Sequence, residues 1–171
     1  TRMELTRLKK QLATALRGHK LLKDKRDELM RQFLDMIRET KTLREEVEER
    51  LKSVNNDFVL ASSVMSKEEL DTALLAPKQE VYLAASTRNV MSVDIPVYSF
   101  KTRTSEQSDI FSYGFASTSF ELDDAVSGLS DLLPKMLKLA EMEKSVKLMA
   151  DEIEKTRRRV NALEHVMIPR Y

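Results

Sequence analysis

The sequence contains no cysteine and no tryptophan, and its 171 residues include only 3 glycines, 4 prolines and 2 histidines. The lack of cysteine excludes disulfides and thiolate metal sites, and it fits a cytosolic compartment. No apolar run approaches the roughly 18 residues that a membrane-spanning helix needs. Basic residues number 29 and acidic residues 28. The net charge therefore gives no overall field that would select nucleic acid or an anionic membrane surface.

The sequence also offers little of the chemistry of an enzyme, which needs a concave site with converging polar groups. Its glycines, Gly18, Gly114 and Gly128, are isolated, so no glycine-rich loop is present that could hold a phosphate. His19 falls on a helical seam, where we expect it to fix the helix register rather than bind a metal. We therefore predict no catalytic residue, no metal site and no cofactor, and we expect any nucleotide hydrolysis to belong to another chain.

Charged residues are abundant, at 33% of the chain, and apolar residues recur at helical spacing. From Met3 to Leu75 the intervals alternate between three and four, which is typical of a seam between helices. The a positions of this heptad are Leu5, Leu12, His19, Arg26, Phe33, Thr40, Val47 and Val54, and the d positions are Leu8, Ala15, Leu22, Leu29, Met36, Leu43 and Arg50. A second stripe is expected to widen the buried face, and it consists of Leu16, Met30, Ile37 and Leu51.

The same spacing returns in the last third of the chain. A capping box from Thr118 to Glu121 is expected to begin the second long helix, and Pro169 ends the pattern. The a positions are Leu132, Leu139, Val146, Ile153, Val160 and Met167, and the d positions are Lys135, Met142, Met149, Thr156 and Leu163. A similar capping box, from Ser66 to Glu69, indicates a break near the end of the first helix.

The middle of the chain has a period of two instead. Apolar residues alternate with other residues in two short runs, and a polar stretch from Lys101 to Asp109 separates them. This pattern predicts a β-hairpin with a long turn, whose Pro96 requires an edge strand. An isolated hairpin is marginally stable in water, so we expect it to contact the helices or a partner. The expected contact residues are Val93, Ile95, Val97, Phe111 and Tyr113, and Phe115 continues the second run.

Together these patterns predict an all-α dominated fold, a long antiparallel two-helix coiled coil with a small β-hairpin insertion at the bend. We expect the N-terminal long helix within residues 1–76, the hairpin and loops within 77–117, and the C-terminal long helix within 118–171. If the helices turn back between residues 70 and 121, the numbers of facing residues add up to about 190. An ordinary helical bundle and a parallel homodimeric coiled coil remain as alternatives.

A basic run of Lys155, Arg157, Arg158 and Arg159 lies near the end of the second seam. Three consecutive arginines span most of a helical turn, so they cannot all share one face. Surface charge on a helix is one interpretation, and contact with acidic loops of a surrounding partner is another. Nucleic acid is a third interpretation, although no aromatic side chains accompany the run for base stacking.

Two stretches resemble the D subunit of the V-type and A-type rotary ATPases. One runs from Gly18 to Leu29 with the sequence GHKLLKDKRDEL, and the other from Lys155 to Arg170 with the sequence KTRRRVNALEHVMIPR. The two stretches are far apart and in the order of the family, and the whole chain fits the family plan of long helix, short β insertion and long helix. Family members continue past the Ile-Pro sequence with a further helical tail, which is absent beyond Tyr171 here.

The resemblance implies a non-catalytic central-stalk rotor subunit. Such a component transmits torque between ATP hydrolysis or synthesis in a catalytic hexamer and ion translocation in a membrane ring. The implied partners are the F subunit of the rotor, the hexamer of catalytic and non-catalytic subunits, and the connector to the membrane ring, with no nucleic acid and no direct membrane insertion. The implied location is peripheral, on the cytoplasmic face of the membrane. The expected shaft contacts are Lys20, Lys23, Arg26, Lys155, Arg157, Arg158, Arg159, Asn161 and Glu164.

Two other functions stay open from the sequence. A generic coiled-coil scaffold would have the same seams without any role in torque, and co-purification with a nucleotide-binding hexamer separates the two. An enzyme subunit with its own active site would show turnover as an isolated chain.

Overall fold

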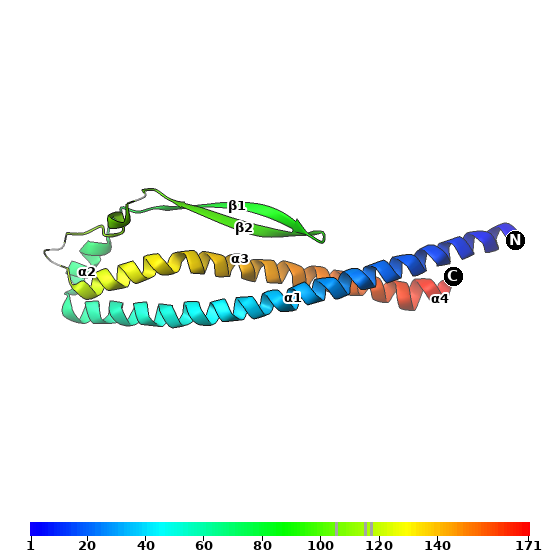
Figure 1. Ribbon diagram of the computed structural model, residues 1–171, viewed down its shortest axis with the longest axis horizontal. Coiled ribbons are helices and arrows are strands. Elements are labelled where there is room, and N and C mark those ends of the chain that lie inside the picture. Colours follow the sequence, from blue (N-terminus) through cyan, green and yellow to red (C-terminus); the bar gives the residue numbers. More distant parts are fainter. Residues whose placement is uncertain (105, 115, 117) are drawn as a thin grey trace. The chain divides into compact units, whose positions relative to one another are not determined.

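The computed structural model describes residues 1–104, 106–114, 116 and 118–171. Its elements are, in chain order, helices α1 (Arg2–Val64) and α2 (Lys67–Leu74), strands β1 (Val81–Val90) and β2 (Val93–Thr102), the 3₁₀ helix η1 (Gln107–Ile110), helix α3 (Phe120–Ala162), the π-helical segment η2 (Leu163–Met167) and helix α4 (Ile168–Arg170) (Figure 1). The strands form a two-stranded sheet. The predicted fold class, two long helices with a small β-hairpin between them, is confirmed.

The described chain divides into two compact units. The first unit contains Thr1–Arg38, Arg88–Ile95 and Glu143–Tyr171, and the second contains Glu39–Thr87 and Pro96–Met142. Each unit therefore includes a part of α1, a part of the hairpin and a part of α3. Each also has its own cluster of buried apolar side chains.

In the first unit the hairpin packs onto the helix pair. Val93 and Ile95 of β2 are buried against Leu29 of α1 and against Met149 and Ile153 of α3. Burial of an aliphatic side chain stabilises a fold by about 1.5–3 kcal/mol, so this cluster supports a hairpin that would be marginal alone. The three helical residues are seam positions, and the seam prediction is confirmed at these sites.

In the second unit the core lies where α1 ends and α3 begins. Ala61 and Met65 pack with Ala73 of α2 and Leu122 of α3, and all four are buried. The side chain of Tyr113 lies against this cluster. Further along, the seam positions Val47, Val54 and Leu132 are also buried, as the heptad pattern predicts.

Ser66 begins α2 with the predicted capping box. Its hydroxyl accepts a hydrogen bond from the Glu69 N–H at 3.3 Å, and the Glu69 carboxylate accepts one from the Ser66 N–H at 2.9 Å. The bond from the Ser66 backbone, with a second from its hydroxyl, lowers the pKa of Glu69 because both favour the charged carboxylate. The other predicted capping box is wrong, since α3 begins at Phe120 and the Thr118 hydroxyl donates to the Gly114 carbonyl.

Facing residues give the helix register within each unit. In the first unit Lys25 Nζ lies 3.4 Å from Glu152 Oε1, and His19 Nε2 lies 3.4 Å from Glu164 Oε2. In the second unit Lys135 forms an ion pair with Glu46. Adding the residue numbers within each pair gives 177, 183 and 181. The helices are therefore antiparallel, and the predicted value of about 190 is wrong because α1 already ends at Val64 and α2 is a separate helix.

Three of the four residues of the second apolar stripe are exposed and not buried as predicted, and the fourth, Leu51, is partly buried. Leu16, Met30 and Ile37 are 49%, 39% and 37% exposed, and Leu34 beside them is 45% exposed. The seam alone fills the space between the two helices, so the outer stripe of α1 stays on the surface within the described residues. Such a stripe is a surface on which a partner can pack.

The hairpin differs from the predicted one. Its turn is Met91–Ser92, with φ values of 51° and 72°. Val93, Ile95 and Val97 lie in a strand as predicted, whereas Phe111 follows η1 and Tyr113 lies in a bend. Phe115 lies outside the described residues. The turn was not predicted because a turn with positive φ at both positions usually contains asparagine or glycine, and Met91–Ser92 contains neither. The strand β1 was not predicted because its apolar residues do not clearly alternate.

Gly128 marks a close approach of the helices in the second unit. A Cβ atom at this position would lie 2.9 Å from Cγ2 of the buried Val54. We expect Gly128→Ala to destabilise the chain by about 1–3 kcal/mol through overpacking, which outweighs the gain in helix propensity of about 1 kcal/mol. Urea unfolding measures this change.

Val54→Ala makes room for the new methyl, so the double variant should be more stable than the two single effects predict. Strict additivity would contradict the close approach.

Candidate partner-binding surfaces

The first unit contains the excess of positive charge. Residues 1–26 have nine basic and two acidic side chains, and residues 155–171 have five basic and one acidic. Both segments belong to the first unit, where they run beside each other in the register of the His19–Glu164 pair (Figure 1). The second unit has ten basic and seventeen acidic residues. The net charge of +1 is therefore the sum of a positively charged first unit and a negatively charged second unit.

The arginine run lies on the outside of α3. Lys155, Arg157, Arg158 and Arg159 are exposed, while their neighbours Thr156 and Val160 are buried in the seam. Arg158 Nη2 lies 2.6 Å from Glu154 Oε1, one turn earlier. The other three cations have no acidic partner within the part of the chain that the structure describes. Unpaired, solvent-exposed guanidinium groups are available to carboxylates of another chain.

The remaining predicted shaft contacts lie at the same level of the helix pair. Lys20 and Lys23 are exposed on α1, and Asn161 is exposed on α3. Arg26 is partly buried and pairs with its neighbour Asp27 at 2.7 Å. Glu164 faces His19. The structure therefore brings these residues together in one stretch of the first unit, and their contact with a partner stays a proposal.

Thr156 is a buried polar residue beneath the cationic surface. Its side chain is fully buried, and its hydroxyl has no hydrogen-bond partner among the described residues. We expect Thr156→Val, which keeps the shape and removes the hydroxyl, to stabilise the chain by about 1–2 kcal/mol. Urea unfolding measures the change. The control is Thr14→Val, since that exposed hydroxyl bonds the Lys10 carbonyl at 3.0 Å and its loss should be nearly neutral. A destabilised Thr156→Val variant would mean that the hydroxyl is hydrogen-bonded in solution.

The predicted hairpin contacts are mostly internal. Val93 and Ile95 are buried against the helices, so they are not free to bind a partner. Val97 is partly buried. Phe111 and Tyr113 pack edge to face with ring centroids 6.1 Å apart. The Tyr113 hydroxyl donates to Asp123 Oδ1 at 2.8 Å, and burial followed by this bond raises the pKa of Tyr113.

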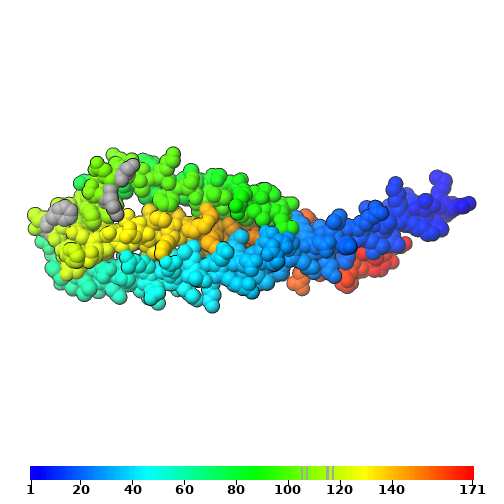
Figure 2. Space-filling view, in the orientation of Figure 1, coloured from blue at the N-terminus to red at the C-terminus, as the bar shows by residue number. Residues whose placement is uncertain are grey.

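Sequence reasoning missed two exposed apolar surfaces. One is on β1 and β2, where Val81, Leu83 and Phe100 are exposed on one face of the hairpin and Tyr82 on the other; Figure 2 shows the hairpin, in green, at the surface. The other is in the second unit near the ends of α1 and α2 and includes Phe58, Val59, Leu60, Val64, Leu74 and Leu75. Val64 is 67% exposed and Leu75 is 82% exposed, which is unusual for large apolar residues in one region and is typical of interaction sites.

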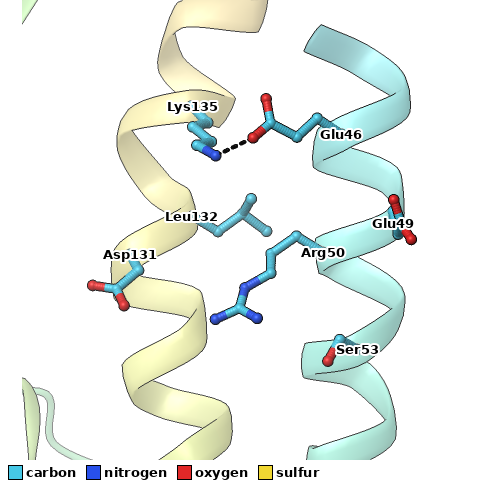
Figure 3. Close-up of a pocket in the computed structure, with 7 residues that line it drawn as sticks. All are labelled: Glu46, Glu49, Arg50, Ser53, Asp131, Leu132 and Lys135. Carbon is cyan, nitrogen blue, oxygen red and sulfur yellow. Dashed lines mark hydrogen bonds and ion pairs between the residues drawn. The ribbon is translucent and has the colours of Figure 1, made fainter. Parts of the chain in front are cut away.

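The second unit also has an open depression of about 600 Å³. Glu46, Glu49, Arg50 and Ser53 of α1 line it, with Asp131, Leu132 and Lys135 of α3 (Figure 3). Arg50 and Lys135 are charged residues at seam positions, and Figure 3 shows Arg50 directed toward α3 while Lys135 pairs with Glu46. The Glu46–Lys135 ion pair joins the two helices at this depression, whose lining presents no nucleophile with an adjacent general base.

No group of three or more histidine, cysteine or acidic side chains in the described residues is arranged to hold a metal ion. Within the same residues, no helix is both long enough and apolar enough to cross a membrane.

Comparison with known proteins identifies close relatives. The family model for the D subunit of ATP synthase matches residues 4–171. The chain is similar to a protein of Acetivibrio thermocellus that is named as the D subunit of V-type ATP synthase, with 64% identity over 99% of this chain and 76% of the relative. It is also 61% identical to the protein of the same name from Clostridioides difficile, over 100% of this chain and 77% of the relative. A third, from Clostridium novyi, is 55% identical over 99% of this chain and 79% of the relative.

Proposed function

Since this chain belongs to the family of ATP synthase D subunits, we propose that it is the central-stalk rotor component of a V-type ATP synthase. In this role it transmits torque between ATP hydrolysis or synthesis in a catalytic hexamer and ion translocation in a membrane ring. It supplies no catalytic residue and binds no cofactor. Its location is peripheral, on the cytoplasmic face of the membrane. Residues 1–76 and 118–171 act as the shaft, and residues 77–117 as the insertion.

The observation that carries this proposal is the continuous helix α1 of 63 residues, packed against α3 in each unit. Torque transmission needs an element that resists twisting and bending. Helices locked by interdigitating side chains are stiff because each buried residue is held by several neighbours. The buried seam positions Leu29, Val54, Leu132 and Met149 supply such contacts in the two units.

The cationic surface of the first unit supports contact with the hexamer. A rotor must be held in place without being locked at one angle. Exposed Arg157 and Arg159 can interact with successive carboxylates over several ångströms, whereas a deep apolar contact would fix one orientation. The chain is also asymmetric, because α1 and α3 have different sequences. It can therefore present a different face to each catalytic interface and shift that interface between conformations.

The exposed apolar surfaces support contact with the other rotor subunits. The outer stripe of α1 in the first unit, formed by Met30, Leu34 and Ile37, suits a helix of the F subunit. The apolar residues near the ends of α1 and α2 in the second unit suit the connector to the membrane ring.

Reconstitution tests the proposal. The chain is mixed with the purified catalytic and non-catalytic subunits of the same organism, and rotation of a bead attached to the chain is followed under ATP. We expect the chain to bind the hexamer and to rotate, and the isolated chain to show no nucleotide binding by calorimetry. A chain that binds the hexamer without rotating would be a static scaffold, and nucleotide binding by the isolated chain would contradict a non-catalytic role.

A further inference from the structure

The two strands of the hairpin pair in a register that fixes the direction of every backbone group. The turn Met91–Ser92 joins Val90 to Val93, and the Arg103 N–H donates to the Glu80 carbonyl at 2.8 Å. In both pairs the residue numbers add up to 183. Antiparallel strands bond at alternate residues, so the even-numbered residues of β1 bond β2. The odd-numbered residues direct their N–H and C=O groups away from β2.

The outer groups of β2 behave as this register requires. Tyr98, opposite Ala85, donates its N–H to Glu141 Oε2 at 2.7 Å instead of to β1. Pro96, opposite Thr87, has no N–H to donate. At these two positions the outer edge of β2 therefore has no free N–H group.

The corresponding edge of β1 has no such partner. The N–H and C=O groups of Val81, Leu83, Ala85 and Thr87 point to this edge, and no described residue bonds them. All of these residues are exposed. Native edge strands are usually blunted by a proline, a lysine, a bulge or a cover, and the segment from Val81 to Thr87 has neither proline nor lysine.

The side chains beside this edge are apolar. Val81, Leu83 and Ala85 lie on the sheet face opposite to that of Val93 and Ile95, because side chains alternate along a strand. Their cross-strand neighbours on this face are Tyr98 and Phe100, and Phe100 is 38% exposed. A helix could cover such a face but could not bond alternate N–H and C=O groups along an edge. Only an extended backbone meets both requirements.

We propose that β1, from Val81 to Thr87, binds an extended segment of another subunit of the assembly as a third strand of the sheet. The bound segment of the other subunit is uncharged where it pairs with β1, and its aliphatic side chains extend the apolar face formed by Leu83 and Phe100. Glu80 at one end of this edge already pairs with Arg103 at 3.5 Å, whereas Arg88 at the other end has no acidic partner among the described residues, which favours a segment with an acidic residue at that end. The proposal rests on the proposed function, which supplies the other subunits.

Hydrogen exchange of single amides is the test, on the isolated chain and on the chain reconstituted with the other purified subunits. The even-numbered amides of residues 82–86 should be protected in both samples, since they bond β2. The odd-numbered amides of residues 81–87 should exchange fast in the isolated chain and become protected only on assembly. Fast exchange of the odd-numbered amides in a complex that assembles and rotates would overturn the third strand and leave the function intact. A chain that does not assemble with the other subunits would contradict both the third strand and the proposed function.

A proline variant gives an independent measurement. Ala85→Pro removes one outward N–H, as Pro96 already does in β2, and keeps the bonds between β1 and β2. We expect its affinity for the other subunits to fall roughly tenfold, which corresponds to about 1.4 kcal/mol, whereas Ala85→Val should bind as the wild type does. Equal affinity of both variants would contradict the proposal. The edge could also bind a second copy of this chain, and light scattering of the isolated chain tests this alternative. A dimer whose odd-numbered amides are protected would assign the edge to a second copy and would overturn the proposal.

Discussion

Replacing Leu29 with alanine is expected to lower the free energy of unfolding by about 3 kcal/mol. Leu29 is fully buried in the first unit, where it contacts both the hairpin and α3. Its truncation removes apolar contacts and leaves a cavity between three elements that cannot all close in, since Val93 and Met149 are held by their own strands and helices. Thermal or urea unfolding, followed by circular dichroism, measures the loss.

The matched control is Leu34→Ala on the same helix. Leu34 is 45% exposed, and the same chemical change there should alter stability by less than about 1 kcal/mol. The hairpin provides a second readout, because loss of Leu29 should also speed the exchange of its amides. If Leu29→Ala and Leu34→Ala have equal effects, the hairpin does not pack where the structure places it.

Reversing the charge of Arg157 and Arg159 together is expected to slow association with the catalytic hexamer about a hundredfold at low salt. Both guanidinium groups are exposed and have no acidic partner in the described chain, so Arg157→Glu with Arg159→Glu should leave the fold intact. Association is attractive when cations meet carboxylates and repulsive after reversal. Stopped-flow binding at several ionic strengths measures the rate, and the difference should shrink as salt screens the charges.

Lys144 and Lys147 provide the control for this experiment. They are exposed on α3 in the same unit, and their replacement by glutamate changes the net charge by the same amount. If association depends on the position of the cations, this variant should bind nearly as fast as the wild type. Equal slowing by the two double variants would show that only the total charge matters, and the proposed contact at Arg157 and Arg159 would be wrong.

The sequence alone predicted the central part of the helical seams, although the outermost seam positions Leu5 and Met167 are 54% and 41% exposed. A residue that must be buried once every 3.5 positions leaves a strong periodic signal, and Leu29, Val54, Leu132 and Met149 are buried as predicted. Exposure of the outer stripe at Met30 and Ile37 could not be predicted in the same way. An apolar residue carries the same signal whether the structure covers it or leaves it for another chain.

The hairpin was the least predictable element. The segment VYLAASTRNV of β1 lacks a period of two because neither of its faces is buried, and the aromatic residues after residue 110 suggested a strand that the structure does not form. For the candidate surfaces, the arginine run flanks the seam positions Thr156 and Val160, which predicts that some of its side chains point outward. The free edge of β1 had no sequence signal, since it follows from the hydrogen-bond register and not from the side chains.

The antiparallel register also dictates an order of folding. Val54 and Gly128 meet across a connection of moderate length, whereas Lys25 is 127 residues from Glu152 and His19 is 145 residues from Glu164. Closing the shorter connection costs less chain entropy, and each contact then shortens the loop that the next one must close. The helix pair is therefore expected to zip from the second unit toward the chain termini, and the cationic surface is the last part to form. During synthesis, nothing of this pairing can begin until the first turns of α3 have left the ribosome.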